Sequence, residues 1–129
     1  MKVTFLGTGT STGIPTIGVE RESCLSSDKR DNRLRSSILI EYKSKSILID
    51  CGPDFRQQML RINKTKVDAI FFTHEHADHT AGLDDIRPIS FHHGKIPIYA
   101  HQRVVDNLKN RFDYLFDKKG DYPGSPHVY

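Results

Sequence analysis

The 129 residues are enough for one domain with its own core, and their composition excludes several classes of protein. Lysine and arginine outnumber the acidic residues by 19 to 16, a net charge of +3 that is too small for a dedicated nucleic-acid binder. The two cysteines, Cys24 and Cys51, cannot form a disulfide framework. The first apolar run, residues 3–6, is too short for a secretory signal, and no stretch has the roughly 18 apolar residues that cross a membrane. We therefore expect a cytoplasmic protein with no membrane partner.

Strands and helices are expected to alternate along the chain. Five segments have the length and apolar content of strands, namely residues 3–6, 37–42, 46–50, 67–72 and 96–99. Two segments carry apolar residues at helical spacing, namely residues 55–62, with Asp54 as the N-cap, and residues 103–116. The run at 67–72 is rich enough in branched and aromatic residues to be buried on both faces. This alternation predicts a layered α/β fold.

Irregular segments separate these elements. A glycine-rich turn occupies residues 7–13, and residues 17–35 read as a long polar loop. Near the end of the chain, residues 122–126 form a turn and residues 127–129 resemble the start of another strand. We interpret the chain as an interrupted domain.

The segment that carries chemistry directly follows the apolar strand ending at Phe72. It contains four potential metal ligands within six residues, His74, His76, Asp78 and His79. His74 and His76 are two apart, so on an extended segment their side chains project to the same side. Adjacent residues diverge in a strand or a helix, so the spacing favours two metals, one held by the histidine pair and one by Asp78 with His79.

Imidazole and carboxylate ligands together suit zinc, with manganese or iron as alternatives. Two metals about 3.5–4 Å apart can activate a bridging hydroxide, which Asp78 can also orient as a catalytic residue. The alternative interpretation, a polar loop with solvent-exposed histidines, leaves the clustering of ligands at the carboxyl end of a strand unexplained.

The pattern His-x-His-x-Asp-His after an apolar strand resembles the signature of the metallo-β-lactamase superfamily. Residues 7–10, 33–37 and 47–50 agree with that superfamily, and residues 82–87 resemble its phosphoribosyl cyclic phosphate phosphodiesterase-like branch. The resemblance implies the N-terminal half of an αββα sandwich, a mixed sheet with helices on its outer face. It also implies that Asp50 accepts an imidazole N–H and so fixes the tautomer of a ligand; a turn-capping role is the alternative.

The family completes its metal site with residues from a second half of the fold, and nothing after His79 matches them. We therefore expect residues 1–129 to be a single incomplete domain that lacks its C-terminal half, with incomplete metal occupancy. The missing half, or a second copy of the chain, is the expected partner. His101 and His127 lie in contexts that favour structural roles, next to a helix start and a proline turn, and the pair His92-His93 reads as an exposed loop.

The resemblance favours a phosphodiesterase that uses a metal-bridged hydroxide on a small phosphodiester substrate and is inactive as this chain alone. Arg33 and Arg35 are weak candidates for binding phosphate, with a solvated basic edge as the alternative. The glycine-rich turn offers backbone N–H groups to an anion, although a plain tight turn explains it equally. The rival functions are a tRNA 3′-processing-type nuclease, for which the small net charge gives no support, and a non-catalytic metal-binding half that needs a partner.

Overall fold

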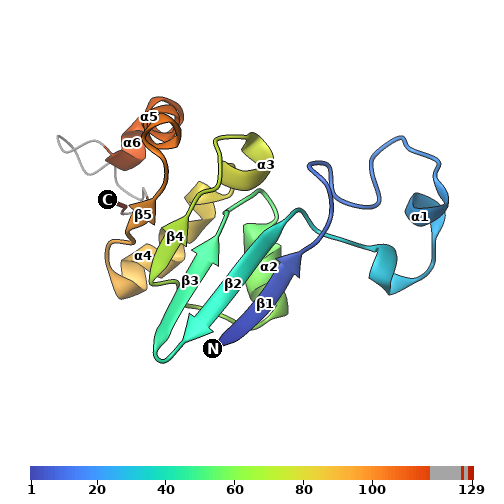
Figure 1. The fold of residues 1–129 in the computed structure, drawn as a ribbon, viewed down its shortest axis with the longest axis horizontal. Coiled ribbons are helices and arrows are strands. Elements are labelled where there is room, and N and C mark those ends of the chain that lie inside the picture. Colours follow the sequence, from blue (N-terminus) through green and yellow to red (C-terminus); the bar gives the residue numbers. More distant parts are fainter. Residues whose placement is uncertain (117–125, 127) are drawn as a thin grey trace.

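The computed structural model describes residues 1–116, 126, 128 and 129. Five strands form one mixed sheet in the order β1-β2-β3-β4-β5 (Figure 1). The strands are β1 (Lys2–Gly7), β2 (Ser37–Tyr42), β3 (Lys45–Ile49), β4 (Ala69–Phe71) and β5 (Ile98–Tyr99). The first three pair antiparallel, whereas β3, β4 and β5 run parallel to one another. The predicted α/β fold is confirmed, and each predicted strand is present.

The alternation of side chains along the strands gives the sheet two different faces. On one face, Leu39, Leu48 and Ile70 stand side by side across β2, β3 and β4 and are fully buried. On the other face, the row that contains Phe5 and Phe71 leaves these side chains 64% and 39% exposed. The expectation that residues 67–72 are buried on both faces is therefore wrong, because nothing in the described residues covers the second face.

Two helices cover the buried face of the sheet, α2 (Phe55–Arg61) and α4 (Arg87–His93) (Figure 1). Their inward residues, among them Phe55, Met59 and Ile89, join the strand residues in one core. The pair His92-His93, expected in a loop, forms the exposed last turn of α4. Proline in the first turn of α4 begins this helix, because its missing N–H is not needed there.

The other helices are short or follow the sheet. They are α1 (Glu22–Leu25), η1 (Lys29–Asp31), α3 (Ala77–Thr80), η2 (Leu83–Ile86), α5 (Gln102–Arg111) and α6 (Asp113–Phe116). The predicted loop over residues 17–35 thus contains two single-turn helices, and Figure 1 shows it extending beyond edge strand β1. The predicted helix over residues 103–116 breaks at Phe112, whose backbone leaves the helical region at φ −129° and ψ 45°.

The predicted turn at residues 122–126 and His127 lie outside the described residues, apart from residue 126. Val128 pairs with Ile96 through a parallel bridge beside β5, where a further strand was expected to start. Among the described residues, no helix is both long and apolar enough to cross a membrane.

Candidate metal centre

The histidines and the aspartate of the motif meet at the carboxyl ends of the parallel strands, between β4 and α3. His76 is the N-cap of α3 and has extended backbone angles, φ −63° and ψ 150°. The chain turns there, and the His79 N–H donates to the carbonyl of His76 at 3.0 Å. Because of this turn, the centre of the His79 ring lies 4.1 Å from the centre of the His74 ring. The centre of the His76 ring lies 4.7 Å from that of His74. Three imidazoles therefore form one cluster.

Asp78 belongs to the same cluster. Its Oδ2 lies 3.2 Å from Nε2 of His79, and both side chains are 18% exposed. The expectation that these neighbouring side chains diverge is therefore wrong. Helix α3 is a single turn that directly follows the histidine pair, and its backbone brings the side chains of Asp78 and His79 together instead of turning them to opposite sides.

Asp50 orients this cluster through hydrogen bonds to its carboxylate. It follows β3 in the left-handed region, at φ 61°, which a residue other than glycine rarely adopts. Its buried carboxylate, 5% exposed, accepts the Thr73 N–H at 2.8 Å and the Thr73 hydroxyl at 2.8 Å. The same Oδ2 lies 2.7 Å from Nδ1 of His79. Strain of this kind is typical of functional sites, where the surroundings enforce it.

The proton positions around Asp50 follow from these contacts. The Thr73 hydroxyl gives its only proton to Asp50, so it accepts the proton on Nδ1 of His74, which lies 2.9 Å away. His79 likewise places its Nδ1 proton on Asp50, because an ionised carboxylate only accepts. His74 thereby keeps an unprotonated Nε2 available as a ligand, whereas Nε2 of His79 faces Oδ2 of Asp78 at 3.2 Å. Thr73 was not predicted from the sequence as part of the site.

Hydrogen bonds between backbone groups hold the loop after β3 against the segment that carries the histidines. The Cys51 N–H donates to the carbonyl of His79 at 2.8 Å, and the Gly82 N–H donates to that of Cys51 at 2.9 Å. A Cβ atom on Gly52 would stand 2.1 Å from the carbonyl oxygen of Asp78, so only glycine fits there. Gly52 is another contributor that the sequence did not reveal, since its role depends on a contact with a distant segment.

The Cys51 thiol itself takes no part as an anion. Complete burial, and then the charges of Asp85 and Asp50, raise the pKa of this thiol well above its usual value. Because the thiol stays protonated at neutral pH, Cys51 contributes its backbone and its apolar volume rather than a thiolate ligand.

The two arginines considered for phosphate binding have partners of their own within the chain. Arg35 donates Nη1 to Asp54 at 3.0 Å and Nε to the carbonyl of Ser11 at 2.8 Å. Asp54 is the N-cap residue of α2, as predicted, but its carboxylate accepts the backbone N–H of Arg35 and makes no side-chain hydrogen bond with its own helix. Arg33 donates to the carbonyl of Arg30 at 3.1 Å.

The glycine-rich turn packs closely against the backbone of residues 34 and 35. The Gly9 N–H donates to the carbonyl of Leu34 at 2.8 Å, and a Cβ atom on Gly7 would stand 1.9 Å from the carbonyl oxygen of Arg35. These glycines thus permit two backbone segments to approach.

His101 is the N-cap of α5, and its Nδ1 accepts the N–H of Arg103 at 3.2 Å.

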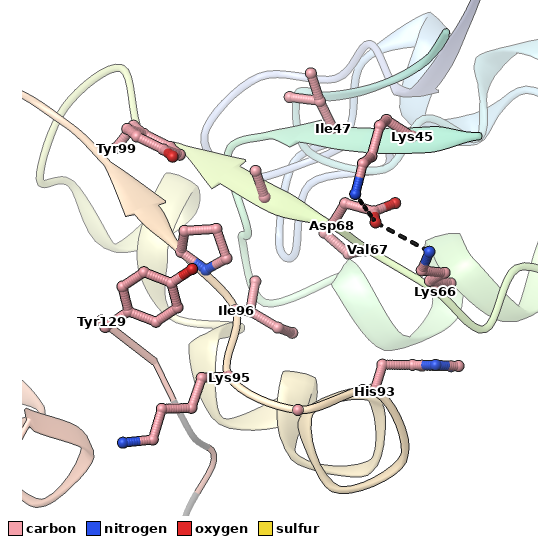
Figure 2. Close-up of a pocket in the computed structure, with 13 residues that line it drawn as sticks. Lys45, Ile47, Lys66, Val67, Asp68, His93, Lys95, Ile96, Tyr99 and Tyr129 are labelled. Carbon is pink, nitrogen blue, oxygen red and sulfur yellow. Dashed lines mark hydrogen bonds and ion pairs between the residues drawn. The ribbon is translucent and has the colours of Figure 1, made fainter. Parts of the chain in front are cut away.

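A cavity of about 430 Å³ lies at the end of the sheet opposite the histidine cluster, where β3, β4 and β5 begin (Figure 2). Three lysines line it, but Lys45 and Lys66 point at Asp68 and pair with its Oδ1 at 3.2 and 3.0 Å. Burial raises the pKa of Asp68, while the Ser46 N–H and the two lysines lower it more, so the carboxylate stays charged. Two of the three cations here therefore neutralise an acid of the chain.

Zinc fits the donors of the motif in kind, since unprotonated imidazole nitrogens and a carboxylate are its ordinary oxygen and nitrogen ligands. Within the part of the chain that the structure describes, however, no group of three or more His, Cys, Asp or Glu side chains is arranged to hold a metal ion. The described residues therefore bring candidate ligands close together and orient them, but no three of them are arranged around a single metal position.

The fold and this cluster define a class of protein. The family model described as a beta-lactamase superfamily domain matches residues 45–128, and the chain belongs to this family. The resemblance inferred from the metal motif is confirmed.

Individual relatives extend this assignment. A crystal structure of a diphosphatase from the PhnP family is 44% identical and superimposes with a TM-score of 0.85, over 98% of this chain and 49% of that one. A ribonuclease Z from Methanococcus maripaludis is 33% identical, over 98% of this chain and 37% of its own length. A protein from Porphyromonas gingivalis named octanoyltransferase is 47% identical, over 98% of this chain and 25% of its own. The chain thus spans from a quarter to a half of these relatives.

Proposed function

We propose that the protein to which this domain contributes is a metal-dependent hydrolase that cleaves a phosphodiester or diphosphate linkage. The observation that carries the proposal is the cluster of His74, His76, Asp78 and His79 over the carboxylate of Asp50. The 44% identity to a diphosphatase, across 98% of this chain, favours phosphorus as the atom attacked.

The cluster would hold two divalent metals, zinc first, with manganese or iron as alternatives. The chemistry that such metals supply is Lewis acidity, which polarises a phosphoryl oxygen and lowers the pKa of a coordinated water. The chain's own contribution is orientation. Asp50 holds the Nδ1 proton of His79, and Thr73 holds that of His74, so both rings present Nε2 in a fixed direction. Asp78, at 3.2 Å from His79, is the acid placed to orient the attacking water.

Complementation tests this proposal. The chain is mixed with the separately expressed second half of the PhnP-family diphosphatase, and zinc is added. We expect hydrolysis of an aryl phosphodiester or of a nucleoside diphosphate, and its loss with His76→Ala. A folded, zinc-loaded complex that hydrolyses neither compound would contradict the phosphohydrolase proposal and favour a non-catalytic metal-binding half.

A second candidate is a ribonuclease Z-type nuclease, favoured by the 33% identity to the archaeal enzyme over 98% of this chain. The same complex distinguishes it, because a nuclease would process the 3′ end of a precursor tRNA in preference to the small substrates. The name octanoyltransferase carries no activity to this chain, because the chain covers only a quarter of that protein.

The open sheet face and the incomplete ligand set lead us to propose that residues 1–129 act together with a second layer of protein structure. Such a layer would cover the exposed sheet face around Phe5 and Phe71 and supply the remaining ligands. The second half of a longer chain and a second copy of this one are the two candidates.

A further inference from the structure

Helix α5 touches the metal loop, which we define as residues 74–80, through two arginines. Arg111, the last residue of α5, donates from Nη1 to the carbonyl of Glu75 at 2.9 Å and to the hydroxyl of Thr80 at 3.0 Å. Arg103, about two turns earlier in α5, donates to the carboxylate of Glu75 at 3.1 Å. The helix is therefore bonded to the same loop that carries the metal ligands.

The two contacts of Arg111 act on both sides of His76. Thr80 is completely buried, and its hydroxyl donates to the carbonyl of His76 at 2.9 Å. Arg111 binds that hydroxyl and the carbonyl of Glu75 with one nitrogen. The peptide groups before and after His76 are thus fixed by one connected set of hydrogen bonds, and a charged donor strengthens bonds of this type.

The guanidinium is itself anchored. Its Cζ lies 5.3 Å from the centre of the Phe112 ring, in a cation–π contact, and Phe112 is only 8% exposed. Val104 and Leu108 fix the rest of α5 in the core. Arg111 is itself exposed, but it acts from a rigid support and one of its two acceptors, Thr80, is buried. The Arg103–Glu75 pair, with Arg103 72% exposed, is screened by solvent.

We propose that Arg111 is a positioning residue of the metal centre, which fixes the backbone on either side of His76 and thereby raises the affinity of the loop for a divalent metal. This inference rests on the proposed function only in taking the loop as a metal site. Contacts that orient ligands typically change metal affinity about 10–100-fold when they are removed.

The test compares Arg111→Met and Arg111→Lys with Lys109→Met, a change at an exposed position of the same helix. Zinc affinity is measured by competition with a chelator, and amide hydrogen exchange is followed separately in the metal loop and in the central strands of the metal-free protein. Because one nitrogen makes both bonds, a lysine can replace them at nearly the same reach, so we expect Arg111→Lys to retain most of the affinity.

We expect Arg111→Met to lower zinc affinity at least about tenfold and to speed exchange in the loop while β2 and β3 stay protected. Lys109→Met should change neither. Unchanged affinity and loop protection in Arg111→Met, or an equal loss in Lys109→Met, would overturn the inference. If the unmodified chain alone binds no zinc, the exchange of the metal-free loop still decides whether Arg111 positions it, and the proposed function is judged separately on the complemented complex.

Discussion

Replacing Asp50 by asparagine changes the hydrogen-bond acceptor next to the histidine cluster with almost no change in shape. Asparagine tolerates the left-handed backbone that Asp50 adopts at φ 61°, so the substitution adds little backbone strain. The Oδ1 bond to the Thr73 N–H can be kept by the amide oxygen. The position of Oδ2 becomes an NH2 group, which cannot accept from either the Thr73 hydroxyl or Nδ1 of His79.

The magnitude follows from these two lost bonds. Hydrogen bonds to a charged group contribute about 1.5–3 kcal/mol each. Two of them sum to about 3–6 kcal/mol, and rotation of the Thr73 hydroxyl to another acceptor leaves a loss of about 2–4 kcal/mol in the free energy of unfolding. His79 also loses the partner that fixes its tautomer, so zinc affinity should fall about 10–100-fold.

Urea unfolding in the presence of EDTA measures the first effect, and chelator competition measures the second. Asp68→Asn is the matched control, since Asp68 is an equally enclosed carboxylate, with a side chain 11% exposed, at the opposite end of the sheet. It should lower stability but leave zinc affinity unchanged. The reasoning is refuted if Asp50→Asn binds zinc as tightly as the unmodified chain, or if both variants weaken binding equally.

Three further changes have definite expected outcomes. Gly52→Ala places a Cβ 2.1 Å from the Asp78 carbonyl oxygen, so unfolding should become easier by about 1–3 kcal/mol in urea titration; an unperturbed midpoint would contradict the close contact. Burial, and then a hydrogen bond to a carboxylate, raises the pKa of Tyr114 to about 12, so ultraviolet titration should show one late phenol. Its stabilising contribution should be present below about pH 10 and lost as the pH rises towards 12. Phe5→Lys, at an apolar side chain 64% exposed on the open sheet face, should reduce self-association in light scattering, and unchanged particle size would argue against that face as the contact.

Much of the architecture could be predicted because the relevant signals are local. The length and apolar content of residues 37–42 predicted β2 with its observed bounds, and the apolar run before Thr73 predicted the position of the histidine motif after β4. His101 was expected near a helix start and is the N-cap of α5. Strand ends were less accurate, since β4 contains only the three residues that pair with β3, and Ile70 and Phe71 alone also pair with β5.

The remainder depends on contacts between distant segments. The single turn of α3 is too short to show a helical period, and it determines that Asp78 and His79 converge. Arg111 looks like any solvent-facing residue of an amphipathic helix until α5 is packed beside the metal loop. Asp54 has the right residue type for a cap, yet the backbone N–H of Arg35 competes for its carboxylate.

The most direct test of the account is the zinc content of the purified chain, measured by elemental analysis beside the His76→Ala variant. We expect zinc to bind at clearly fewer than two equivalents, because no three of the described ligands are arranged to hold one metal ion, and we expect His76→Ala to lose it. Equal zinc in the two proteins would show that the histidine cluster is not a metal centre. Two tightly held equivalents would show instead that the chain, or a second copy, completes the site.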